Sequence, residues 1–160
     1  MGYDTYIQNP DGTPREGDEH YFRFGWTTGH HAFEVMANFG MVTDTPMPAW
    51  PQLTAYGLTK GDFALGNDAS EATKQAIAKY REDWFAVRDW AEPEPTGIPS
   101  FKLHFNEGRL ITPQELSAAL AAYEVHPNYA IAEMPVGDLT WGRWTAFLRR
   151  ARDLGGLRVH

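Results

Sequence analysis

Residues 141–160 read WGRWTAFLRRARDLGGLRVH, and this stretch decides how the chain can fold. Placed on a helix at about 100° per residue, its apolar side chains fall within an arc of about 140°. They are Trp141, Trp144, Phe147, Leu148, Ala151 and Leu154. Burying the five large ones stabilises a docked helix by on the order of 7–15 kcal/mol before the entropy cost is subtracted. We therefore expect this helix to form part of the core.

The end of the same stretch predicts how the helix stops. Gly155 follows the last apolar position, and we expect it to adopt the left-handed conformation that ends many helices. Leu157 stands where an apolar contact commonly follows such a stop. Leu157–Val159 are then expected to add a last strand to a sheet.

Basic charge is concentrated in residues 141–160. They hold five of the fourteen basic side chains and one acid, whereas the other 140 residues hold nine basic and twenty acidic side chains. Arg143, Arg149 and Arg150 form a basic ridge on the expected helix, which either pairs inside the protein or meets an acidic partner. We favour internal pairing. A net charge of −7 disfavours nucleic-acid binding and attraction to anionic lipid.

The composition limits the classes of protein that this chain can belong to. A chain of this length is expected to form one domain, residues 1–160. Cysteine is absent, which excludes disulfides, thiolate nucleophiles and cysteine-based metal sites. No run of about twenty apolar residues suggests a membrane span, and the first residues do not resemble a signal peptide. We therefore expect a cytoplasmic protein that makes no membrane contact.

The first part of the chain predicts a β-hairpin. Residues 3–8 favour a strand and are followed by the turn sequence NPDG. In residues 20–26, the rings of Phe22, Phe24 and Trp26 alternate with small or polar residues, which places all three on one face of a second strand. The two strands are expected to pair.

Two helices have clear start signals. Thr28 is expected to cap a helix over residues 29–39, whose apolar positions follow helical spacing. Thr112, Pro113 and Glu115 combine a cap, a proline at the first helical position and a capping-box glutamate. The second of these is the strongest local signal in the chain.

A long helix is expected to begin at Asp68 or Ser70, with Glu71 completing a capping box from Asp68. It should present a buried apolar stripe made of Ile77, Tyr80, Trp84, Val87 and Ala91. Apolar residues then alternate with polar ones over residues 101–105, which predicts a short strand. Together these elements indicate an α+β fold, a small antiparallel sheet packed with about four helices.

Residues 43–67 show no clear period and contain Trp50, Tyr56 and Phe63. A loop this long is uncommon in a domain and is often functional. Two interpretations are equally supported. The rings could form a rigid contact surface for another protein, or they could fold back as a small additional core.

The sequence contains no catalytic constellation and no indication of a bound cofactor. His30 and Glu34 are four residues apart on the expected helix and could hold one metal ion. A third ligand would have to come from His20, His104 or His126. Solvent-exposed histidines at the start of a helix are the simpler interpretation.

The segments YFRFGW, TPQEL and FLRRARDLGGLRVH resemble small proteins of unassigned function from actinobacteria and their phages. This resemblance implies a cytoplasmic accessory protein, phage-encoded relatives included, and carries no site residues over.

Our leading hypothesis from the sequence is a non-enzymatic protein that binds another protein through Trp50, Tyr56 and Phe63. The alternative is a metal-dependent hydrolase or nucleotide-processing enzyme that uses His30 and Glu34.

Overall fold

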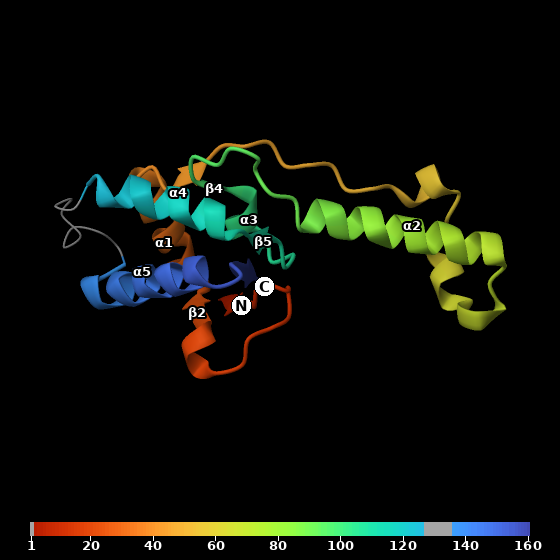
Figure 1. The fold of residues 1–160 in the computed structure, drawn as a ribbon, viewed down its shortest axis with the longest axis horizontal. Coiled ribbons are helices and arrows are strands. Elements are labelled where there is room, and N and C mark those ends of the chain that lie inside the picture. Colours follow the sequence, from red (N-terminus) through yellow and green to blue (C-terminus); the bar gives the residue numbers. More distant parts are fainter. Residues whose placement is uncertain (1, 127–135) are drawn as a thin grey trace. The chain divides into compact units, whose positions relative to one another are not determined.

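The computed structural model describes residues 2–126 and 136–160, which form two units (Figure 1). Unit 1 combines Met1–Met47 with Ala91–His160, and unit 2 is Pro48–Trp90. The secondary structure confirms the expected α+β class. The expectation of one domain over residues 1–160 stays a prediction.

Unit 1 is built on a four-stranded antiparallel sheet with the strand order β2-β1-β6-β5. The strands are β1 (Gly2–Ile7), β2 (Tyr21–Gly25), β5 (Leu110–Ile111) and β6 (Leu157–Val159). The predicted hairpin is confirmed, because Gly2–Tyr6 of β1 pair with all five residues of β2. The predicted last strand is also confirmed, and it lies between β1 and β5.

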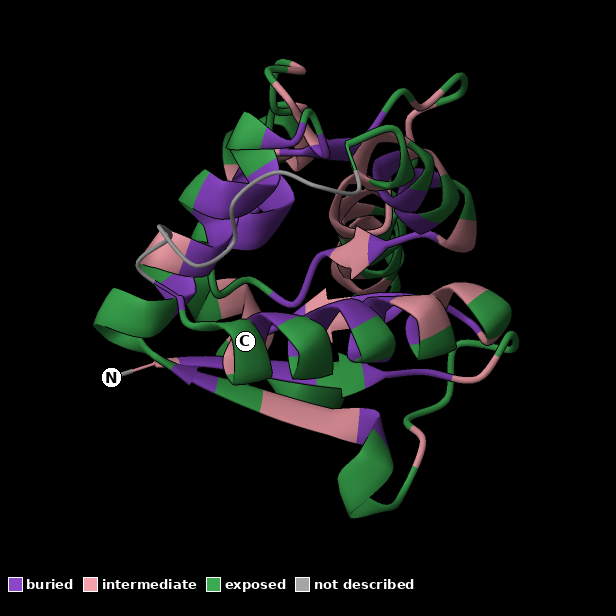
Figure 2. Ribbon diagram, turned by 90° about the vertical axis from the view of Figure 1, so that its left-hand side faces the viewer, coloured by how far each residue is buried: buried purple, intermediate pink, exposed green. Residues whose placement is uncertain are grey.

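One face of this sheet is apolar. Tyr3, Thr5 and Ile7 of β1 are buried, and Phe24 and Phe22 lie opposite the first two on β2. The residues between them point to the other, more polar face, since successive side chains in a strand alternate. In Figure 2, buried and exposed residues alternate along the helices, and most turns are exposed.

Two helices cover the apolar face of the sheet, α1 (Trp26–Asn38) and α5 (Asp138–Asp153), whose rings meet those of Tyr3, Phe22 and Phe24. The helix α4 (Pro113–Glu124) packs against α5, and α3 (Phe101–His104) is a single helical turn. A single 3-10 turn, η1 (Asp18–His20), precedes β2, and a second, two-stranded parallel sheet pairs β3 (Val42–Thr43) with β4 (Ile98–Pro99).

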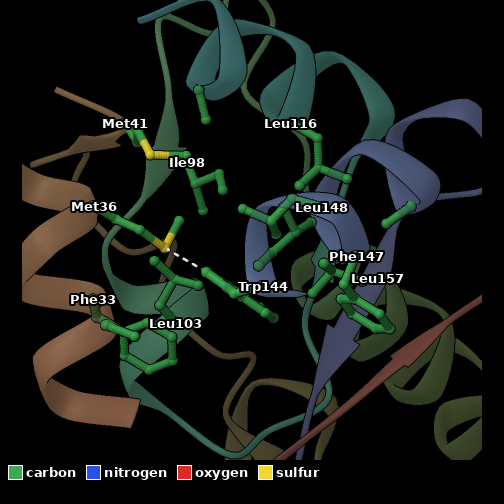
Figure 3. Close-up of a cluster of buried hydrophobic side chains, with 14 of the residues drawn as sticks. Phe33, Met36, Met41, Ile98, Leu103, Leu116, Trp144, Phe147, Leu148 and Leu157 are labelled. Carbon is green, nitrogen blue, oxygen red and sulfur yellow. Dashed lines mark hydrogen bonds between the residues drawn. The ribbon is translucent and has the colours of Figure 1, made fainter. Parts of the chain in front are cut away.

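The predicted apolar arc of the terminal helix is confirmed as part of the core, except that Leu154 follows the last helical residue and is only partly buried (Figure 3). The side chain of Trp144 is fully buried, and its indole N–H donates to the sulfur of Met36 at 3.3 Å. Its ring lies 4.9 Å from that of Phe24 and 5.3 Å from that of Phe22. Trp144 therefore joins α5 to the hairpin and to α1.

A buried ion pair joins four further segments of unit 1. The Lys102 ammonium lies 2.7 Å from a Glu115 carboxylate oxygen, and the two side chains are 1% and 0% exposed. Lys102 also donates to the Leu110 carbonyl at 2.8 Å. The carboxylate accepts from the backbone N–H groups of Thr112 and Glu92. Each charge is thus hydrogen-bonded on several sides, which a buried charge requires.

Replacing Lys102 by Met should lower the free energy of unfolding by about 3–5 kcal/mol, because the Glu115 charge is left buried and uncompensated. The double variant Lys102→Met, Glu115→Gln should be more stable than Lys102→Met alone, since glutamine keeps an oxygen for the helix cap without a charge. Chemical denaturation measures the free energy of unfolding of each variant.

Arg152→Met is the matched control, because Arg152 forms an exposed pair with Asp153. It should change stability by no more than about 0.5 kcal/mol. A double variant no more stable than Lys102→Met alone would contradict the role given to the buried charge.

The strand predicted over residues 101–105 is wrong, since α3 occupies Phe101–His104. Phe101, Lys102 and Leu103 are all buried, which one helical turn allows and a half-exposed strand does not. The ion pair explains the error. The sequence pattern predicts that Lys102 points to solvent, because lysine is polar. In the structure its ammonium is buried and donates to the Glu115 carboxylate.

The predicted start of α1 is also wrong. Gly25, not Thr28, is the cap residue, and the helix begins at Trp26. β2 therefore runs into α1 without a loop, and the third ring of the expected strand belongs to the helix. The Trp26 ring stacks on Tyr3 at 5.3 Å and an angle of 11°, a tertiary contact that the local sequence does not indicate.

The helix stop after α5 differs from the prediction by one residue. Gly156, with φ +85°, adopts the left-handed conformation that we expected at Gly155. Gly155 is needed for space, since a Cβ atom there would lie 2.2 Å from the Asn9 carbonyl oxygen. Its N–H donates to the Gln8 carbonyl. The two glycines thus meet different requirements.

Unit 2 is dominated by the long helix α2 (Glu71–Arg88). Ser70 caps it, and its hydroxyl accepts from the Thr73 N–H at 3.1 Å. The capping box predicted from Asp68 is wrong, because Asp68 ends a preceding 3-10 turn. The segment before α2 contains three such turns: η2 (Leu53–Tyr56), η3 (Lys60–Ala64) and η4 (Gly66–Asp68).

The predicted apolar stripe of α2 has the expected helical spacing, but the prediction that it is buried is wrong. Ile77, Tyr80, Trp84 and Val87 are all partly exposed, Ala91 lies beyond the helix and is exposed, and α2 has no buried residue. The buried apolar residues described in unit 2 are Leu58 and Ala69. Unit 2 therefore has too little chain around α2 to cover its apolar side.

Candidate protein-interaction site

Six aromatic rings of unit 2 lie together and are called the aromatic cluster below. Its members are Trp50, Tyr56, Phe63, Tyr80, Trp84 and Phe85. The first three precede α2, and the last three belong to it. The structure therefore brings together all three residues that the sequence singled out for protein binding.

The rings of the cluster contact one another in two groups along α2, one around Trp84 and one around Tyr80. Trp50 stacks on Trp84 with ring centres 5.0 Å apart and an angle of 22°. Tyr56 and Phe63 both meet Tyr80 edge-on, at 5.5 Å and 5.8 Å. Tyr80 and Trp84 can receive these rings because residues four apart share one face of a helix. Residues 50–63 thus fold back on α2 within unit 2, as one of the two interpretations of this loop required.

Folding back does not bury the cluster. Trp50, Tyr56 and Phe63 stay partly exposed, and Phe85 is 47% exposed. Contiguous exposed apolar surface of this kind is typical of interaction sites. The cluster therefore combines both interpretations of the loop, since its rings support one another and still present a surface.

A hydrogen bond attaches Tyr56 of the aromatic cluster to α2. The Tyr56 hydroxyl donates to the Asp83 carboxylate at 2.7 Å, and Lys79 lies 2.9 Å from the same carboxyl group. The hydrogen bond from Tyr56, followed by that from Lys79, lowers the pKa of Asp83. The same bond raises the pKa of Tyr56, because the carboxylate stabilises the protonated phenol.

Two arginines of α2 lie against the rings. The Arg88 guanidinium carbon is 4.7 Å from the centre of the Phe85 ring, and that of Arg81 is 5.9 Å from the Phe63 ring. Beside the second pair, a hollow of about 230 Å³ lies between Phe63 and the face of α2 that carries Ile77 and Arg81. Aromatic and arginine side chains are the residues most enriched at energetically important positions of protein interfaces.

The histidine candidates are only partly brought together. His30 lies 3.5 Å from Glu34, and its ring centre is 6.3 Å from that of His104. His20 is buried and bonded to Arg15 and to a backbone carbonyl instead, and His126 is exposed. Among the described residues, no group of three or more side chains is arranged to hold a metal ion.

The basic ridge of α5 has contacts within unit 1. Arg150 donates to the Glu19 carbonyl, and Arg143 lies 5.9 Å from the centre of the Phe22 ring. Arg149 is partly exposed. Arg150 thus contacts a carbonyl and Arg143 a ring. Neither group carries a negative charge, so these contacts do not neutralise the ridge.

No protein-family model, curated protein or solved structure matches this chain. The resemblance to small proteins of actinobacteria and their phages therefore stays a prediction. None of the helices within residues 2–126 and 136–160 combines the length and hydropathy needed to cross a membrane.

The sequence did not reveal the partners of the predicted rings. Tyr80 and Trp84 appeared as a buried stripe, and Phe85 received no role. The aromatic spacing of α2 was the available signal, since its apolar side needed a cover and the preceding loop carried three unassigned rings.

Replacing Tyr56 by Phe should raise the pKa of Asp83 toward its ordinary value, because the hydrogen bond that favours the carboxylate is removed. A lowered pKa stabilises the folded state above the unfolded-state value, and this contribution is lost as the pH falls through the folded-state value. The variant should therefore lose less stability on acidification.

The pKa can be followed by NMR titration of the Asp83 carboxyl carbon. Tyr80→Phe is the matched control, because it removes a neighbouring hydroxyl that does not bond to Asp83. An Asp83 pKa that moves equally in both variants would contradict the assigned bond.

Proposed function

We propose that this protein is a small, non-enzymatic accessory protein of the cytoplasm that binds another protein through the aromatic cluster of unit 2. The observation that carries the proposal is an apolar helix side that stays partly exposed after three rings of the preceding segment have packed on it. Exposing such a surface to water is unfavourable unless a partner covers it.

The geometry of the cluster suits recognition rather than catalysis. Its rings are held by stacking and by the Tyr56 bond to Asp83, so little side-chain entropy is lost on binding. Phe85 stands at the exposed edge beside Arg88, where it can enter a pocket on a partner. These are the properties of an anchor residue in an interface.

Site-specific photo-crosslinking tests the proposal. A photoreactive phenylalanine at position 85 should capture one defined protein in cells of the source organism. The same residue at position 139 is the control, because Leu139 of α5 is 78% exposed and lies outside the cluster. The substitutions Trp50→Ala and Tyr56→Ala, introduced together, should abolish the captured product.

Identical products at the two positions, or none at position 85, would contradict the proposal. So would a product that survives the double substitution in a protein whose circular dichroism shows that α2 is intact.

The alternative of a metal-dependent hydrolase or nucleotide-processing enzyme has weaker support. His30 and Glu34 are both exposed at the surface of α1, and the described residues supply no group of three ligands. Metal analysis separates the hypotheses. Stoichiometric zinc or manganese that is lost in His30→Ala would favour the enzyme, whereas the accessory protein should purify without either metal.

A further inference from the structure

The outer edge of β2 is an open strand edge in unit 1. In the described part of the chain, β2 has one neighbouring strand, β1. The Asp4 N–H donates to the His160 carbonyl and the His160 N–H donates to the Asp4 carbonyl, so the backbone groups of Asp4 face β6. The adjacent residues Tyr3 and Thr5 therefore turn theirs toward β2, because backbone direction alternates along a strand.

This alternation identifies the groups on the open edge. Phe24 and Phe22 pair with Tyr3 and Thr5 and use their backbone groups there. The backbone N–H and carbonyl groups of Tyr21, Arg23 and Gly25 then point away from β1. The Tyr21 N–H already donates to Asp18, and the Gly25 carbonyl lies where the first bond of α1 begins.

The open edge thus offers four groups in the order that an added strand requires. They are the carbonyl of Tyr21, the N–H and carbonyl of Arg23 and the N–H of Gly25. A single extended segment could bond to all four without any change in β2.

A groove runs along this edge, with α5 as its opposite wall. One hollow of about 470 Å³ lies between Tyr21–Gly25 and the side chains of Thr140 and Arg143. A second of about 240 Å³ shares Tyr21, Phe22 and Arg143 with the first and extends to Arg150. The two are therefore parts of one groove, called the β2 groove below.

Positive charge lines the helix side of the β2 groove. Arg143 and Arg150 lie seven residues apart on one face of α5, about 10 Å along its axis, a distance that a few residues of extended chain span. Arg23 on the strand side is 61% exposed and lies 3.7 Å from the Asp4 carboxylate, which offsets part of its charge. Asp18 lines both hollows, whereas Glu19 lines the second one. The part of the first hollow beside Arg143 is therefore the more attractive to an acidic side chain.

A second copy of this chain does not suit the groove. Antiparallel pairing of two β2 edges about Arg23 would set Arg23 of one copy opposite Arg23 of the other. Like charges directly opposite each other in a sheet are destabilising, and charged residues on an edge strand commonly prevent such pairing. The favoured occupant is therefore a different, negatively charged segment.

We infer that the β2 groove binds an extended acidic peptide segment of a partner protein, which adds a strand beside β2 and places its carboxylates against Arg143. The backbone groups of Tyr21, Arg23 and Gly25 supply the hydrogen bonds, and the arginines select the charge of the side chains. This site lies within unit 1 and is independent of the aromatic cluster.

The inference can be tested with a seven-residue peptide of alternating valine and glutamate, capped at both ends. Fluorescence anisotropy should show binding to the full-length protein, and the matched valine–lysine peptide should not bind. Arg143→Glu should weaken binding at least tenfold. Arg152→Glu makes the same charge change on α5 outside the groove, and should alter the affinity less than threefold.

Backbone pairing is tested separately from charge. Two further peptides carry N-methyl groups on alternate amides in the two possible registers, and one of them should lose binding while the other keeps it. In the bound state the amides of Arg23 and Gly25 should become protected from hydrogen exchange, whereas those of Phe22 and Phe24 should already be protected in the free protein.

Three results would overturn the inference: no binding of the acidic peptide, equal effects of the two arginine variants, or binding with no new protection at Arg23 and Gly25. The last two would indicate general attraction of charge without strand addition. Phe85→Glu should leave peptide binding unchanged, so this outcome is separable from that of the proposed function.

Discussion

Unit 1 depends on the buried contact between Lys102 and Glu115. A single carboxylate caps α4, accepts from the N–H of Glu92 and neutralises an ammonium that in turn holds the carbonyl of Leu110. Removing either charge leaves the other without compensation in a region that excludes water. The position of α3, the end of β5 and the start of α4 are thereby set by one another.

The sheet of unit 1 has one well-covered face and one open edge, the outer edge of β2. Trp144 and its neighbours bury the face that carries Phe22 and Phe24, which fixes the side on which α5 lies. β2 passes directly into α1 at Gly25, and no strand of the described residues lies beyond it. The open edge and the arginines of α5 then face the same groove.

Unit 2 has more apolar surface on α2 than its short chain can cover. One long helix carries its aromatic stripe, and the three short turns before it supply rings but little additional cover. Tyr56 illustrates the compromise, since its ring packs against Tyr80 while its hydroxyl bonds to the half-exposed Asp83. The partial exposure that results is the physical basis of the proposed protein binding.

The sequence by itself determined the elements whose signals are local. The apolar period of α5, the capping box at Thr112 and the pairing of the first two strands follow from spacing and from residue type. Trp50, Tyr56 and Phe63 were recognisable as rings without a place in any pattern. Only the tertiary structure decided that residues 101–104 form a helix and that β2 lies at an edge. The reason is that a buried lysine and a strand neighbour are defined by partners distant in sequence, which no local pattern contains.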